Sequence, residues 1–153
     1  MTNSSTPSTL KRLITTSVVY IAFAIVAGIL GISRNLPAEP MGEGSGTGRP
    51  VLQEFLLGNG TAISPGLSWL ALQAVLTFIA GRRDRWGTTS VVLLAFHALL
   101  SGIFATTEPT FRRVFTPATF DPLLMVVELA NVVLPCLVVT FAVLEWLRRR
   151  RTV

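Results

Sequence analysis

Two long stretches without a charged residue constrain the fold of this chain more than any other feature. They run from Leu13 to Ile32 and from Thr88 to Thr107. As helices rising about 1.5 Å per residue, each would cross the roughly 30 Å hydrocarbon core of a bilayer. Only 14% of the 153 residues are charged and the mean hydropathy is +0.60, whereas charged residues make up about 25% of a typical soluble domain. The sequence therefore predicts an all-α, polytopic membrane protein with a single domain.

Four transmembrane helices are expected within residues 13–147, at 13–32, 65–81, 88–106 and 122–147. The second is the least obvious, and its predicted start rests on Ser64 as an N-cap and Pro65 in the first turn. The fourth start is clearer, because the Asp121 carboxylate can cap a helix in which Pro122 needs no N–H donor. Short connections favour antiparallel neighbours, so a four-helix antiparallel bundle is predicted.

Two tails and a long outer loop account for the rest of the chain. They are a disordered N-terminal tail at 1–12, an outer loop at 33–64 and a basic C-terminal tail at 148–153. Within the loop, Pro50 can open a helical turn before the apolar residues from Val51 onward, and Gly58 can end it. A short helix on the membrane surface is expected there, but an irregular loop with a few apolar anchors fits the same residues.

The basic residues Lys11 and Arg12 ahead of the first apolar stretch also fit a secretory signal peptide. Signal peptides have an apolar core of about 7–15 residues, and this stretch extends over about 20. The first helix is therefore expected to remain in the protein as an uncleaved transmembrane helix.

Basic residues are distributed unequally between the two sides that four crossings would create. Nine lie on the side shared by both termini and the turn after the second helix, and four lie on the other side. Because basic segments stay in the cytoplasm, both termini are predicted to be cytoplasmic and the 33–64 loop to lie outside. Arginine makes up nearly all of the basic residues, which is typical of a GC-rich genome, so the expected location is a bacterial inner membrane.

One face of the fourth predicted helix is polar within an otherwise apolar segment. Glu128, Asn131 and Pro135 stand at positions i, i+3 and i+7, which fall on one side of a helix. Pro135 has no N–H to donate to the carbonyl of Asn131, so a helix break is predicted there. Each unsatisfied polar group would cost several kcal/mol in hydrocarbon. This face is therefore expected to contact protein or water.

Polar side chains on two other helices fall at the same depth in the predicted bundle. Gln73 on the second helix and His97 and Ser101 on the third would lie level with Glu128 and Asn131, forming an intramembrane polar cluster. In such a cluster, Glu128 and His97 could share a proton and form a proton relay or cation site. The alternative is polar glue, in which hydrogen bonds between these side chains only hold the helices together.

Composition disfavours several other kinds of site. The single cysteine, Cys136, excludes an intrachain disulfide, and its apolar surroundings predict a buried, unreactive thiol. The single histidine cannot supply both axial ligands of a haem, and no cofactor is predicted. His97, Glu128 and Asn131 are too few ligands for a metal ion, so no metal site is predicted. The basic residues flank apolar stretches without a nucleic-acid-binding motif, so no nucleic-acid partner is expected.

Three hypotheses about function follow from the sequence. The preferred one is a small non-enzymatic accessory or scaffold subunit that binds a membrane protein partner in the lipid bilayer. The second is a proton- or ion-coupled transporter, or a channel-like protein, that uses Glu128 and forms a homo-oligomer because four helices enclose little water. The third is a membrane-embedded redox or lipid-modifying enzyme with Glu128 and His97 as acid and base. No motif supports the third, and no catalytic residue is assigned.

Overall fold

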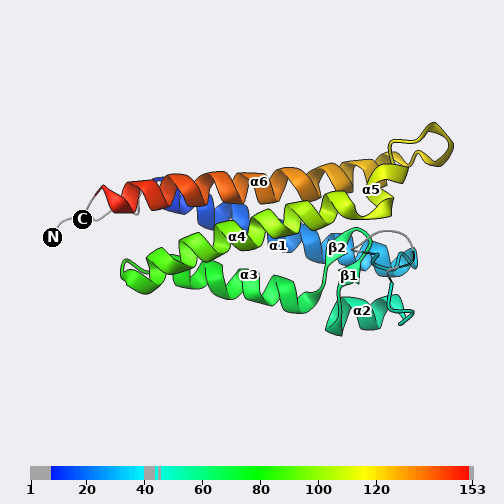
Figure 1. The fold of residues 1–153 in the computed structure, drawn as a ribbon, viewed down its shortest axis with the longest axis horizontal. Helices are drawn as coiled ribbons and strands as arrows, with labels where there is room; N and C mark the ends of the chain where they lie inside the picture. Colours follow the sequence, from blue (N-terminus) through cyan, green and yellow to red (C-terminus); the bar gives the residue numbers. More distant parts are fainter. Residues whose placement is uncertain (1–7, 40–43, 45, 152–153) are drawn as a thin grey trace.

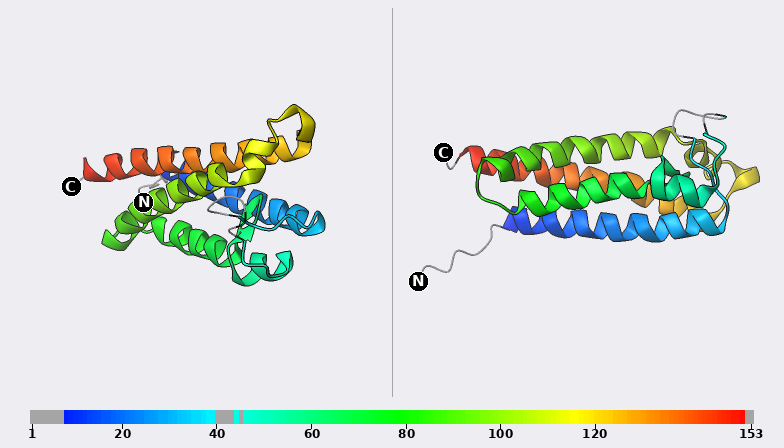
Figure 2. Two further views of the ribbon diagram at one scale, coloured as in Figure 1. Left: turned by 45° about the vertical axis from the view of Figure 1, so that its right-hand side comes forward. Right: turned by 90° about the horizontal axis from the view of Figure 1, so that it is seen from below.

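Four apolar helices lie side by side along the long axis of the molecule (Figure 1). They are α1 (Ser8–Ser33), α3 (Leu67–Ala80), α4 (Arg85–Thr107) and α6 (Pro122–Arg150). The computed structural model describes residues 8–39, 44 and 46–151. Helices α1 and α6 pack against each other, α3 and α4 do the same, and α1–α3 and α4–α6 contacts complete the bundle. The views in Figure 2 show that neighbouring helices run antiparallel, as predicted.

The two ends of the bundle differ in what they contain. The start of α1 and the end of α6 lie at one end, which we call the terminal end (Figure 1). The opposite end, which we call the hairpin end, contains helix α2 (Val51–Leu57), a short β-hairpin, helix α5 (Pro109–Arg113) and the 3-10 helix η1 (Pro117–Thr119). The predicted helix within the 33–64 loop is therefore confirmed as α2.

Three of the four apolar helices, α1, α4 and α6, are long and apolar enough to cross a membrane. Helix α3 has 14 residues and extends about 21 Å, which is shorter than the roughly 30 Å of a hydrocarbon core. Large apolar side chains also cover the outside of the bundle, and Phe78 of α3 is 83% exposed. The prediction of a multi-pass helical membrane protein is confirmed, but α3 alone is too short for a full crossing.

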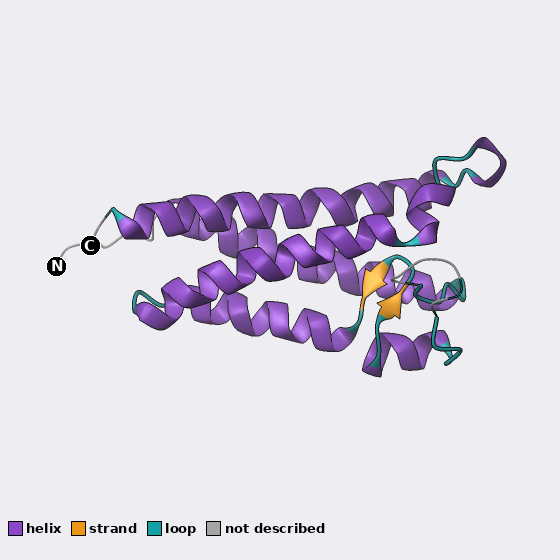
Figure 3. Cartoon of the chain, in the orientation of Figure 1, coloured by secondary structure: helices purple, strands orange, loops and turns teal. Residues whose placement is uncertain are grey.

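A β-hairpin precedes α3 and was not predicted (Figure 3). Strand β1 (Gly60–Thr61) pairs antiparallel with β2 (Ser64–Pro65). Ser64 and Pro65 therefore belong to a strand, and the N-cap of α3 is Gly66. The predicted cap is wrong because the Ser64 hydroxyl donates instead to the Ala24 carbonyl of α1, at 2.7 Å.

The hairpin inserts between the helices, well inside the bundle from the start of α6. Asn131 donates from Nδ2 to the carbonyl of Ile63 at 2.7 Å, and it lies nine residues beyond Pro122, or roughly 14 Å along the helix. Thr61, Ala62 and Ile63 are all buried. Non-helical backbone is tolerated at membrane depth only where protein surrounds it or water reaches it. The hairpin meets this condition because protein encloses it.

Two glycines of α1 lie in close contact with α2 and the hairpin. A Cβ atom at Gly31 would lie 2.5 Å from Thr61 Oγ1, and one at Gly28 would lie 2.3 Å from the ring of Phe55 in α2. The glycines therefore allow α2 and the hairpin to pack directly on the backbone of α1. The same principle lets small residues bring transmembrane helices together.

The ends of the helices differ from the prediction at several positions. Helix α1 begins at Ser8, so residues 8–12 of the predicted disordered tail are helical, and residues 1–7 lie outside the described residues. Helix α4 begins at Arg85 because the Asp84 side chain accepts a hydrogen bond from Gly87 N at 2.9 Å and caps it. Helix α6 extends through Arg150, so residues 148–150 of the predicted basic tail are also helical, and residues 152–153 lie outside the described residues.

The predicted start of α6 is confirmed in detail. Asp121 is the N-cap, and its carboxylate accepts from the backbone N–H groups of Leu123 and Leu124 at 2.9 and 3.1 Å. It also forms an ion pair with Arg34 beyond the end of α1. These hydrogen bonds, that of Leu124 first, lower the pKa of Asp121.

The predicted helix break at Pro135 is wrong, because α6 continues through this residue without interruption. A proline removes one backbone donor from the helix, and neighbouring helices can compensate for that loss. Helix α4 packs at this point, where a Cβ atom at Gly102 would lie 3.7 Å from Pro135 Cβ. Pro135 is also fully buried. Packing therefore holds the helix together where its sequence suggested an interruption.

We expect Gly60→Ala to destabilise the protein by roughly 2 kcal/mol or more. Gly60 has φ +107°, and a Cβ atom there would lie 2.2 Å from the Ser64 carbonyl oxygen. Gly102→Ala is the matched control, because its added Cβ would make only an ordinary contact. Thermal unfolding in detergent measures both variants. Equal melting temperatures for the two variants would contradict the role given to the hairpin turn.

Candidate functional site

A cavity of about 340 Å³ lies at the hairpin end of the bundle. Side chains from α1, α3, α4 and α6 line it together with the hairpin and the residues just before it. Seven of the lining residues are central to the arguments below: Tyr20, Trp69, Ser101, Phe104, Glu108, Glu128 and Asn131. Three of the five residues predicted to form a polar cluster, Ser101, Glu128 and Asn131, therefore meet at one cavity.

Glu128 is the most unusual of these residues. Its side chain is 0% exposed, and neither carboxyl oxygen has a hydrogen-bond partner within the described part of the chain. Leaving a buried polar group unpaired costs about 1–3 kcal/mol, and more for a charged group. The carboxyl is therefore not a hydrogen-bonding strut between helices. It lines the cavity, where a ligand could approach it.

The two polar atoms of the Asn131 carboxamide have different environments. Its Nδ2 donates to Ile63 and holds the hairpin in place. Its Oδ1 accepts no hydrogen bond from the described residues. Half of this side chain thus has the structural role that the polar-glue hypothesis predicts, and the other half leaves an acceptor available at the cavity wall.

The sequence suggested that His97 and Glu128 could share a proton, but the two side chains do not form a hydrogen bond. Neither ring nitrogen of His97 has a hydrogen-bond partner among the described residues, and His97 is not among the residues that line the cavity. Its ring instead stacks on Trp69, with the centroids 4.0 Å apart and an interplanar angle of 25°. The two residues meet because α3 and α4 are neighbours. The depth of a residue along its helix does not reveal which helices are neighbours. His97 therefore supports an aromatic wall of the cavity.

Ser101 fixes the orientation of that wall. Trp69 Nε1 donates to Ser101 Oγ at 2.7 Å, and Ser101 Oγ in turn donates to the carbonyl of His97 at 3.0 Å. The tryptophan is thus held by a hydrogen bond at its edge and by the imidazole on its face. The role of Trp69 in the cavity was not predicted.

Gln73 lies outside the cavity, in a separate polar network. It donates from Nε2 to Ser17 Oγ at 2.8 Å, and Ser17 and Thr77 share a hydrogen bond of 2.6 Å. Thr77 also donates to the carbonyl of Gln73 at 2.7 Å. All three residues are buried. This network ties α1 to α3 and is the polar glue that the sequence offered as the alternative to a functional cluster.

Glu108 is a cavity residue that was not predicted as part of the site. It follows α4 directly, and its two carboxyl oxygens accept from the backbone N–H of Glu39 at 3.0 and 3.2 Å. Burial raises the pKa of Glu108 to about 7. Its position in a connecting segment gives no periodic signal, which is why the sequence did not indicate it.

The segment before the hairpin is held by Glu54 of α2. Its carboxylate accepts from the Thr47 hydroxyl and from Asn59 N, the latter at 3.1 Å. These hydrogen bonds, that of Thr47 first, lower the pKa of Glu54. Gly58 and Asn59 line the cavity. Glu54 therefore orders the backbone on one side of the cavity without facing it.

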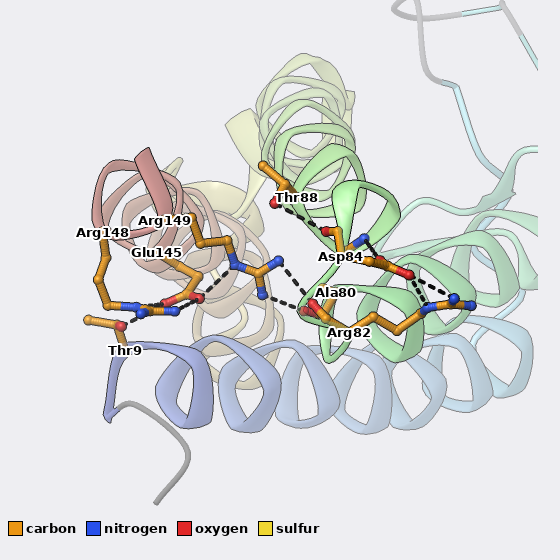
Figure 4. Close-up of polar contacts among 9 residues, drawn as sticks. Thr9, Ala80, Arg82, Asp84, Thr88, Glu145, Arg148 and Arg149 are labelled. Carbon is orange, nitrogen blue, oxygen red and sulfur yellow. Dashed lines mark hydrogen bonds and ion pairs between the residues drawn. The ribbon is translucent and has the colours of Figure 1, made fainter. Parts of the chain in front are cut away.

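The terminal end of the bundle contains a second fully buried glutamate with the opposite environment (Figure 4). Glu145 accepts hydrogen bonds from Thr9 at 2.8 Å, from Arg148 at 2.6 and 2.8 Å and from Arg149 at 2.8 Å. Arg149 continues to the carbonyls of Ala80 and Arg82, at 2.7 and 3.1 Å, at the C-terminal end of α3. One carboxylate thus joins α1, α3 and α6 at this end.

Two further expectations concern metal and thiol chemistry. The described residues contain no group of three or more His, Cys, Asp and Glu side chains that could hold a metal ion. Cys136 is exposed on α6, so the prediction of a buried thiol is wrong. The residue follows buried Pro135 and points away from the helices that cover that proline.

Comparison with protein families, with curated proteins and with solved structures found no significant match to this chain.

We expect the two buried glutamates of α6 to respond oppositely to replacement by leucine. Glu128→Leu should leave the melting temperature in detergent unchanged or raise it, because it removes a polar group without a partner. Glu145→Leu should destabilise the protein by about 3 kcal/mol, because it leaves two arginines without their carboxylate. A large loss of stability in Glu128→Leu, with Glu128→Gln tolerated, would show that Glu128 is a strut after all.

We also expect stability to fall as the pH rises from about 4.5 to about 7, partly through Glu108. Its raised pKa means that the folded protein holds a proton in this range that the unfolded chain has released. The full shift corresponds to about 3 kcal/mol, and partial solvent screening reduces this to about 1–2 kcal/mol. Thermal unfolding at pH 5.5 and pH 8 measures the effect. Glu108→Gln should make the pH dependence smaller, and an unchanged dependence would refute the assignment.

Proposed function

We propose that this protein is a non-enzymatic, multi-pass membrane protein that binds a small ligand in the cavity at its hairpin end through Glu128. In this proposal α3 and the hairpin together make the fourth crossing, both termini are cytoplasmic, and the cavity faces the outside of a bacterial inner membrane. The excess of basic residues at the terminal end supports this orientation.

The observation that supports the proposal most strongly is the contrast between the two buried glutamates of α6. Both side chains are 0% exposed. Glu145 has four hydrogen bonds from three residues, whereas Glu128 has none within the described residues and lines a cavity. Ionisable residues within transmembrane segments mark ligand and ion pathways when they are not simply paired. Glu128 fits that description and Glu145 does not.

The competing hypotheses explain less of the site. A pure scaffold accounts for the Ser17–Gln73–Thr77 network but not for a buried carboxyl without a partner. An acid–base enzyme would need His97 and Glu128 to act together, but the described contacts of His97 are with Trp69 and Ser101. A ligand-binding protein accounts for both the structural network and the cavity.

A binding site of this kind suits a carrier or a subunit whose assembly depends on a ligand. Four helices enclose too little space for a continuous water path, so a carrier would function as a homo-oligomer or with a partner subunit. In mild detergent a carrier would purify as a homo-oligomer, whereas an accessory subunit would purify with a stoichiometric membrane protein partner.

Carbodiimide labelling tests whether the cavity admits a small molecule. Diisopropylcarbodiimide is small and apolar, and it reacts with protonated carboxyl groups. We expect mass spectrometry of the protein in detergent to find Glu128 labelled at least roughly tenfold faster than Glu145, since an ion-paired carboxylate stays deprotonated. Glu145 is the internal control, because it lies in the same helix and is equally buried. Labelling of Glu128 as slow as that of Glu145 would refute an accessible binding site.

A further inference from the structure

The charged side chains that line the cavity all have the same sign. Two lining residues are acidic, Glu108 and Glu128, and no lysine, arginine or histidine is among the lining residues that the structure describes. A concave site lined by charges of one sign favours ligands of the opposite sign. The partner that Glu128 lacks within the described chain is therefore a positively charged group.

One neutral polar residue at the cavity, Asn131, also offers an acceptor. Asn131 has used its donor on Ile63, which leaves Oδ1 facing a ligand that can donate. Ser101 already donates to the carbonyl of His97 and accepts from Trp69. A ligand with N–H donors and a positive charge would match the carboxyls and this amide oxygen together.

Aromatic side chains supply the rest of the recognition surface. Trp69, Phe104 and Tyr20 all line the cavity, and Trp69 and Phe104 meet edge to face with centroids 6.2 Å apart. Aromatic rings attract cations and cover apolar groups at the same time. Since the orientation of Trp69 is fixed by Ser101 and His97, this wall exists before a ligand binds.

The size and chemistry of the cavity favour an organic cation over a metal ion. Its volume of about 340 Å³ lies at the lower end of the range of about 300–1,000 Å³ for small-molecule sites. A hard metal ion would need several oxygen ligands in place of aromatic walls. The described lining residues include two carboxyls, and the described residues contain no group of three or more acidic, histidine or cysteine side chains that could hold a metal ion.

We propose that the cavity binds a small alkyl- or arylammonium ion, with its charged group at Glu128 and Glu108 and its apolar part against Trp69 and Phe104. This inference rests on the proposed function, because both require Glu128 to be the ligand-binding group of an accessible cavity. It adds the chemical class of the ligand, which the proposed function leaves open.

Protection of Glu128 from carbodiimide tests the proposal on the wild-type protein in detergent. The rate at which Glu128 is modified by diisopropylcarbodiimide is measured against increasing butylammonium chloride, with sodium chloride holding the ionic strength constant. The N-acylurea adduct and the butylamide formed when the amine displaces the urea from the activated carboxyl are counted together. Butan-1-ol serves as the uncharged analogue of similar size. Butylammonium should slow labelling of Glu128 by roughly tenfold or more at saturation, because a bound cation keeps the carboxyl deprotonated. Butan-1-ol and sodium should leave the rate within about twofold of its starting value.

A series of variants tests whether the carboxyl of Glu108 also binds the ammonium ion. Glu108→Gln should raise the butylammonium concentration that gives half protection by roughly tenfold, because one of the two negative charges is removed. Glu39→Gln is the matched control, since Glu39 lies near Glu108 but does not line the cavity. Its half-protecting concentration should stay close to that of the wild type. Each variant is compared with its own rate of labelling without ligand.

The possible outcomes separate this inference from the proposed function. If Glu128 is not labelled at all, the accessible site is refuted and the inference fails with it. If Glu128 is labelled but butan-1-ol protects as well as butylammonium, the site binds neutral ligands and only the inference is refuted. Equal protection by sodium alone would identify an inorganic cation site and would likewise overturn the inference. Unchanged half protection in Glu108→Gln would remove Glu108 from the site.

Discussion

Hydrocarbon offers no hydrogen bonds, and the arrangement of this bundle depends on that constraint. Every polar group that enters the apolar region must find a partner in the protein or face water. The hairpin shows the constraint most clearly, because its backbone lies deep among the helices. Asn131 bonds the carbonyl of Ile63, and the hydroxyl of Ser64 bonds the carbonyl of Ala24. A side chain of α6 and a backbone carbonyl of α1 therefore hold the hairpin in place.

The same constraint explains which parts of the fold could be predicted from the sequence. Uncharged stretches of about 20 residues identify α1 and α4 directly. In a bilayer, the backbone N–H and C=O groups of such a stretch are satisfied when it forms a helix. The cap at Asp121 was also predictable, since it depends on two adjacent residues. The hairpin was not, because strands of two residues have no periodicity. Its turn depends on the positive φ of Gly60 and on close contact with α1, both of which require the folded protein.

The site was predictable to a similar and limited extent. Depth along the helices grouped Ser101, Glu128 and Asn131, and these three residues line one cavity. It did not separate these from Gln73 and His97, because depth says nothing about which way a residue faces around the bundle. The environment of Glu145 could have been foreseen, since Arg148 and Arg149 follow it at i+3 and i+4, where helical neighbours meet. That of Glu128 could not, because its lack of partners is a property of the assembled helices.

The position of His97 changes the chemistry that the cavity can perform. A histidine beside Glu128 would have made an acid–base pair, able to pass a proton back and forth. With the imidazole stacked against Trp69, the histidine instead stabilises an aromatic surface, and Glu128 faces the cavity without a basic partner. A bundle selected only for stability would replace such a carboxyl with an apolar residue of similar size. Natural proteins break this rule at functional sites, whereas Glu145 near the opposite end of α6 is fully paired. In the proposed function, the site gives up local stability to keep one negative group available for a ligand.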